Sequence, residues 1–117
     1  MKYSAIFIIL AVIIIIISSV GIGLIFYRQN PERYFYKGEN SYLSGNYENG
    51  IEALNEYISF GYDNELSQKA KYYLAASLKN LGKYELAKRR FLDVINNNKV
   101  STFYVEAIVD YADICRI

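Results

Sequence analysis

Residues 74–91 read LAASLKNLGKYELAKRRF, two apolar runs separated by a glycine. Leu74, Leu78 and Leu81 recur every three or four residues, which is the spacing of one face of an α-helix, and Gly82 is a typical helix stop. After the glycine, small and aromatic residues recur at the same spacing. The stretch therefore predicts two helices joined by a tight turn.

The same pattern occurs earlier in the chain. The sequence GNYE at residues 45–48 recurs 37 residues later as GKYE at residues 82–85. Small residues occupy matching places in the two copies: Gly38, Gly50, Ala75 and Ala87. We expect them to let paired helices approach closely, while aromatic side chains fill the space between: Tyr47, Tyr84 and Phe91. A further shift of 37 residues starts a third copy in the last helix.

Starts and stops along the chain predict five helices after the first 30 residues. Asn30 and Pro31 suit the cap and first turn of a helix, and glycine or asparagine clusters end the later ones. The expected helices are 31–43, 47–59, 65–81, 84–96 and 101–117. The last is expected to bury a stripe of Val105, Ile108, Tyr111 and Ala112 and to expose Glu106, Asp110 and Asp113. No segment alternates with a period of two, so we expect no sheet.

This pattern resembles the tetratricopeptide repeat, a helix–turn–helix unit of about 34 residues. The second copy matches the family best, at Leu74, Ala75, Gly82, Tyr84, Ala87 and Phe91. Lys37 and Gly50 depart from the family pattern in the first copy, and the loop proline is missing from both copies. The resemblance covers residues 32–117. It implies an all-α domain at 30–117, a short α-solenoid of about two repeats and a capping helix.

The resemblance also implies a binding surface. In this family the first helix of each repeat lines a concave groove that binds a protein or peptide. The matching positions that we expect to contact a partner are Phe35, Glu39, Tyr42, Lys69, Tyr72 and Lys79. The aromatic residues among them are not needed by the predicted apolar stripes, so they are candidates for ligand contact.

The amino-terminal region is a membrane anchor by composition. Residues 3–27 contain no charge, and about 20 apolar residues suffice to span a bilayer as a helix. We assign residues 1–29 to a single transmembrane helix at the cell membrane. The alternative is a signal peptide cleaved near Ser19 or Gly21, which would release a secreted protein, but the apolar run continues past this point. Basic residues lie on both sides, and we expect the soluble domain to be extracytoplasmic.

Several chemistries are disfavoured. The chain has no histidine and one cysteine, so a Cys–His nucleophile is impossible, and we expect no enzymatic activity, no metal and no cofactor. We expect Cys115 to be a buried structural thiol. Beyond the anchor, acidic and basic residues balance, which disfavours nucleic acid as a partner.

The sequence therefore predicts a membrane-anchored adaptor or assembly factor that binds another protein. The alternative is a structural subunit of a larger membrane complex. A basic cluster in the second copy is an additional candidate for contact with anionic lipid: Lys83, Lys88, Arg89 and Arg90.

Overall fold

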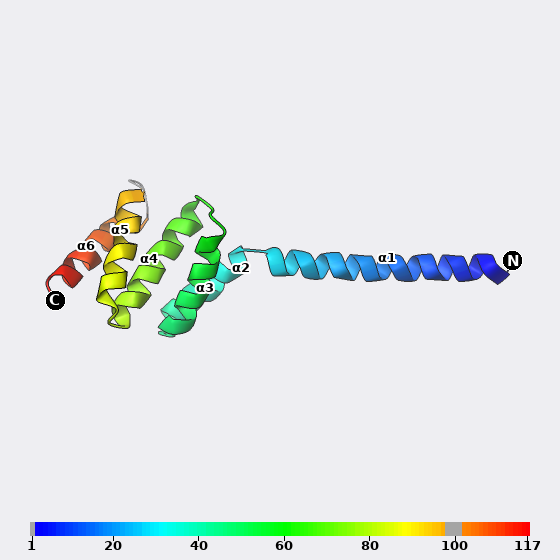
Figure 1. Cartoon of the computed structure of the whole chain (residues 1–117), viewed down its shortest axis with the longest axis horizontal. Coiled ribbons are helices and arrows are strands. Elements are labelled where there is room, and N and C mark those ends of the chain that lie inside the picture. The colour runs from blue at the N-terminus through cyan, green and yellow to red at the C-terminus, as the bar shows by residue number, and fades with distance from the viewer. Residues whose placement is uncertain (1, 98–101) are drawn as a thin grey trace. The chain divides into compact units, whose positions relative to one another are not determined.

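The computed structural model of the chain describes residues 2–97 and 102–117. The described residues form six α-helices and no strand, so the predicted all-α fold is confirmed (Figure 1). The chain divides into two units, Met1–Asn30 and Pro31–Ile117. The helices are α1 (Lys2–Gln29), α2 (Glu32–Leu43), α3 (Tyr47–Ser59), α4 (Glu65–Asn80), α5 (Tyr84–Asn97) and α6 (Tyr104–Cys115).

Helix α1 is long and apolar enough to cross a bilayer. Its segment Tyr3–Gly23 has 21 residues and a mean hydropathy of 3.2, and a helix of that length spans roughly 30 Å, the thickness of the hydrocarbon core. The side chains from Tyr3 to Val20 are all exposed, so no other part of the chain covers this apolar surface. The Ser19 hydroxyl donates a hydrogen bond to the carbonyl oxygen of Ile15 at 2.8 Å, which satisfies a polar group within the helix itself.

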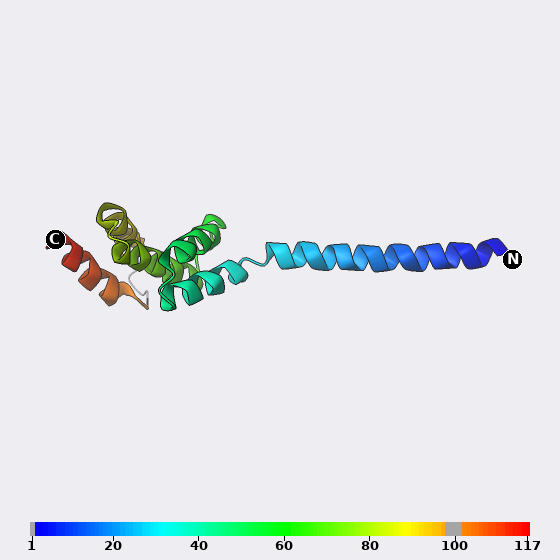
Figure 2. The same ribbon diagram turned by 90° about the horizontal axis from the view of Figure 1, so that it is seen from below.

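The second unit is a stack of helical hairpins. Each helix from α2 to α6 packs against the next, and α4 also contacts α2 and α6. In Figure 2, α3 and α5 lie along one side of the unit, and α2 and α6 lie along the other. The expected boundaries of helices 47–59, 65–81 and 84–96 agree with the structure to within one residue. Pro31 rather than Asn30 caps α2.

The two hairpin turns have the same backbone conformation. Gly45 and Gly82 have φ values of 83° and 75°, which favour glycine because they are strained for other residues. After α2, the amide of Asn46 donates to the carbonyl of Ser41 at 2.8 Å, and after α4 the amide of Lys83 donates to that of Leu78 at 2.9 Å. These bonds close the last turn of a helix in the Schellman arrangement. The 37-residue sequence repeat is therefore repeated in the backbone as well.

Small residues hold the paired helices close together, as predicted. A Cβ atom added to Gly38 would lie 2.5 Å from Cγ of Leu54, so α2 and α3 could not pack this closely around any larger residue. The equivalent residues of the second hairpin, Ala75 and Ala87, are both fully buried. Phe91 is also fully buried, which confirms its expected place in the core. Tyr84, by contrast, is 38% exposed and contributes less to the core than expected.

Helix α4 is anchored at its start by a polar contact to α3. The Asn64 side chain caps α4 by accepting a hydrogen bond from the amide of Ser67 at 2.8 Å. The same oxygen accepts a hydrogen bond from the hydroxyl of Tyr57 at 3.2 Å, and the Tyr57 ring is buried in the core. One asparagine therefore fixes both the start of α4 and its position against α3.

Helix α6 corrects several expectations. It is predicted to start at residue 101, which lies outside the described residues, and it begins instead at Tyr104. Its buried residues are Ala107 and Ile114, whereas Val105 and Ile108 of the predicted buried stripe are 66% and 40% exposed. The reason is that α6 packs on α5 and α4 through the opposite side of the helix. The thiol of Cys115 is exposed, so the expectation of a buried cysteine is wrong.

Candidate interaction face

The candidate site lies on the first helix of each hairpin. Helices α2 and α4 contact one another, and α4 in turn contacts α6. Half-buried polar and aromatic side chains from these three helices come together, and we call this set the first-helix face: Glu39, Tyr42, Tyr72, Lys79, Asp110 and Asp113.

Aromatic rings form the floor of the first-helix face. The rings of Tyr42 and Tyr73 lie 4.9 Å apart between their centroids, which joins α2 to α4. The rings of Tyr72 and Phe103 stack at 4.4 Å with an interplanar angle of 12°, which joins α4 to the residue before α6. Stacked aromatic pairs stabilise a fold beyond the area that they bury. The two tyrosine positions are therefore part of the packing as well as of the surface.

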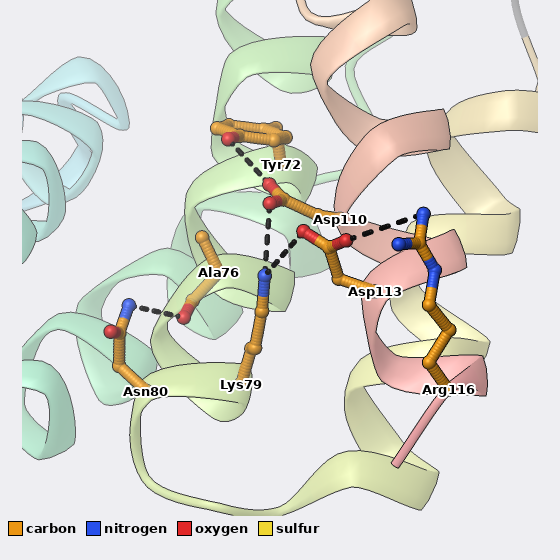
Figure 3. A network of polar contacts seen from close by, with 7 residues as sticks. All are labelled: Tyr72, Ala76, Lys79, Asn80, Asp110, Asp113 and Arg116. Carbon is orange, nitrogen blue, oxygen red and sulfur yellow. Dashed lines mark hydrogen bonds and ion pairs between the residues drawn. The ribbon is translucent and has the colours of Figure 1, made fainter.

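A polar network crosses from α4 to α6 (Figure 3). The Tyr72 hydroxyl donates a hydrogen bond to Oδ2 of Asp110 at 2.8 Å, and the Lys79 ammonium lies 3.0 Å from Oδ1 of the same carboxylate. Lys79 also lies 3.8 Å from Asp113, which in turn lies 3.8 Å from Arg116. The side chains of Lys79 and Asp110 are only 27% and 22% exposed, so their attraction is less screened by water than that of a surface pair.

The environment of the first-helix face keeps its tyrosines protonated. Burial, followed by the hydrogen bond to Asp110, raises the pKa of Tyr72 far above its usual value. Burial and then the charge of Asp110 raise the pKa of Tyr42 as well. Burial, together with a hydrogen bond to Glu39, raises the pKa of Tyr73 to about 12. At neutral pH these hydroxyls are neutral donors next to carboxylates that can accept further hydrogen bonds.

Of the six residues proposed from the sequence, the structure brings only some together. Tyr42, Tyr72 and Lys79 all interact with Asp110, and Glu39 joins them through Tyr73. Lys69 is not part of this network, because its ammonium pairs with Glu65 on its own helix at 3.6 Å.

Phe35 is not available to a ligand, because it is only 1% exposed and packs against Tyr57 and Tyr73. The proposal that it lines the binding surface is therefore wrong. The side of α2 that carries Phe35 faces the stack of the following helices and is buried by them.

Sequence reasoning missed the central residue of the network. Asp110 was expected on the solvated side of the last helix, together with Glu106 and Asp113, but it is half-buried and bonded to α4. The 37-residue register contains the relevant signal, because it aligns Asp110 with Tyr73, which lies next to Tyr72. A carboxylate aligned with a tyrosine of the preceding copy is placed beside that copy's first helix.

The first-helix face carries more negative than positive charge. Glu39, Asp110 and Asp113 supply three carboxylates, and Lys79 supplies one ammonium group. The exposed carboxylate of Glu106 lies on α6 as well. An uneven charge of this kind favours a cationic ligand over an anionic one.

The basic cluster of α5 lies elsewhere and is partly neutralised. Lys88 pairs with Glu85 at 3.0 Å, and Arg90 pairs with Asp93 at 3.4 Å. Arg90 also borders a cleft of about 370 Å³, with walls that come from α3, α4 and α5: Ile58, Lys71, Leu74, Arg90, Asp93 and Asn96. Lys83 and Arg89 are exposed.

Within residues 2–97 and 102–117, no group of histidine, cysteine, aspartate or glutamate side chains is arranged to hold a metal ion. The chain matches no protein-family model, no curated protein and no solved structure in the three comparisons made.

Proposed function

We propose that the chain is a membrane-anchored adaptor, in which α1 crosses the bilayer and the second unit is a short tetratricopeptide-like array that binds a segment of another protein. The length and hydropathy of α1 support the anchor. The repeated hairpin, with the same glycine turn in both copies, supports the repeat class.

The observation that carries the binding function is the convergence of Tyr42, Tyr72 and Asp110 on one face. Tyrosines supply a large contact area with little loss of side-chain freedom, and carboxylates fix the orientation of a ligand. Because Glu39, Asp110 and Asp113 outnumber Lys79, the partner segment carries lysine or arginine. Such a segment would pair with the carboxylates and stack its apolar parts on the rings.

Photo-crosslinking tests this proposal in native membranes. A photo-reactive phenylalanine analogue at position 42 should give an adduct whose partner peptide contains lysine or arginine. The same group at position 48, on the outer side of α3, is the control, because Glu48 is exposed and belongs to the other helix of the hairpin.

Charge reversal makes the test specific. Asp113→Lys changes a side chain that is 46% exposed, so it should abolish the adduct while the chain stays folded. Glu48→Lys reverses a charge of the same sign outside the face and should leave the adduct intact. If position 42 gives no adduct and a photo-reactive group at Arg89 does, the basic side of α5 is the binding surface and the present assignment is wrong.

The adaptor and the structural subunit differ in exchange. An adaptor releases and rebinds its partner, whereas a subunit stays in a constant ratio to it through purification. Quantitative mass spectrometry of the crosslinked material before and after a wash distinguishes the two. For the sidedness of the membrane, we propose that the second unit is extracytoplasmic.

A further inference from the structure

Helix α6 has an apolar stripe on the side that points away from the rest of the unit. Val105, Ile108 and Val109 are 66%, 40% and 53% exposed, and Ala112 is half-exposed beside them. Their spacing of three, four and seven residues places all four on one face of the helix, which is the pattern of a helix that packs on both sides. We call these four residues the α6 stripe.

The repeat explains what this stripe is suited to contact. The 37-residue register aligns Ile108 with Lys71 and Ala112 with Ala75 of α4. In the second hairpin, Ala75 is fully buried in the packing of α4 against α5. The α6 stripe is thus equivalent to a surface that takes a second helix in the preceding hairpin, but no helix among residues 2–97 and 102–117 covers it.

We propose that the α6 stripe is a dimer interface, and that its occupant is the α6 stripe of a second copy of the chain. The stripe contains no charged residue, so it requires no partner of opposite charge, and a second copy presents the same apolar surface. Glu106 and Arg116 flank it on the exposed side of α6, so each copy also offers one charge of each sign to the other.

The size of the stripe indicates why the partner is held in the same membrane. A standard stable interface uses about 20–30 residues on each side, and four residues on one helix fall well below that number. Chains anchored in one bilayer are confined to it, which raises their effective concentration and lets a small contact hold them together. This part of the argument rests on the membrane anchor proposed above.

Cysteine crosslinking of the full chain in phospholipid vesicles tests the proposal. A two-fold contact brings residues at the centre of the stripe close to their own symmetry mates. In a Cys115→Ser background, Ile108→Cys should therefore form a disulfide-linked dimer under mild oxidation. Leu43→Cys is the matched control, because Leu43 is 68% exposed and lies on α2. It should give little dimer at the same density of chains.

A second pair of substitutions separates contact from chance collision. Adding Val105→Asp and Val109→Asp to the Ile108→Cys chain should lower the dimer yield at least about fivefold, because each buries a charge in the apolar contact. Both positions are exposed in the single chain, so helix content by circular dichroism should stay unchanged.

Two results would overturn the dimer. One is equal crosslinking at positions 43 and 108, and the other is a folded Ile108→Cys chain that gives no dimer. Flotation of the same vesicles checks the anchor separately. A chain that floats with the vesicles but does not crosslink refutes the dimer alone, whereas a chain that does not float refutes the anchor.

Discussion

The ammonium group of Lys79 lies 3.0 Å from the carboxylate of Asp110, and this contact joins the middle hairpin to the last helix. The same carboxylate accepts a hydrogen bond from Tyr72. Removing Asp110 therefore leaves two half-buried groups without their main partner, which costs about 1–3 kcal/mol. We expect Asp110→Ala to lower the free energy of unfolding by that amount in urea titrations. Glu106→Ala, at an exposed position on the same helix, should change it by less than about 0.5 kcal/mol.

The two glycines of the first hairpin should respond differently to alanine. At Gly38 the added Cβ would lie 2.5 Å from the fully buried Leu54, and overpacking of this kind costs about 1–3 kcal/mol. At Gly50 the nearest atoms would be 3.4 Å away, close to ordinary contact, and a mid-helix alanine gains up to about 1 kcal/mol over glycine. We expect Gly38→Ala to lower the melting temperature and Gly50→Ala to keep or raise it. Equal effects of both changes would contradict the close approach of α2 and α3.

Phe91 should be the most sensitive position of the second hairpin. It is fully buried and packs against Tyr72, and Phe→Ala in a core costs about 3–5 kcal/mol. Stability of a small domain is of similar size, so the variant should unfold or be degraded. Leu86→Ala removes an apolar side chain that is 48% exposed on the same helix and should melt close to the wild type. A Phe91→Ala melting curve within a degree or two of the wild type would refute this core.

The raised pKa of Tyr73 predicts a loss of stability in alkali. The phenol loses its proton near pH 10 in the unfolded chain and near pH 12 in the folded chain, because burial and Glu39 disfavour the charged form. The folded state therefore holds this proton more tightly. Its contribution is complete below pH 10 and is lost between pH 10 and about 12.

The variant Tyr73→Phe isolates this effect. It removes the titrating group and keeps the ring, so stability should fall less steeply than in the wild type between pH 10 and 12. Tyr36→Phe, at a side chain that is 50% exposed, is the control and should follow the wild-type curve. Parallel curves for the wild type and Tyr73→Phe, measured by urea unfolding at each pH, would show that Tyr73 does not contribute to this loss.

Cys115 provides a direct measurement of membrane sidedness. It is the only cysteine of the chain and its thiol is exposed. If the second unit is extracytoplasmic, a membrane-impermeant maleimide should label intact cells at Cys115 as fully as it labels permeabilised cells. The variant Cys115→Ser gives the background. Labelling that requires permeabilisation would place the unit in the cytoplasm.

The helices themselves were predictable because their signals are local. The positive φ of Gly45 and Gly82 depends on a few neighbouring residues, and so does the cap that Asn64 forms on α4. Apolar spacing then identifies the residues that share a helix face, which is why Phe91 could be assigned to the core from the sequence. The uncharged run that forms α1 follows from composition alone.

Which side of a helix is buried depends instead on neighbours far along the chain. Helix α6 is apolar on two sides, and only its packing on α5 and α4 buries Ala107 and Ile114 while Val105 stays exposed. The same packing moves Asp110 from an expected solvated position into contact with Lys79, 31 residues away in sequence. Periodicity measures the spacing of side chains within one helix. It contains no information on which of two apolar faces meets the neighbouring helix, because that choice depends on the combined packing of all the helices.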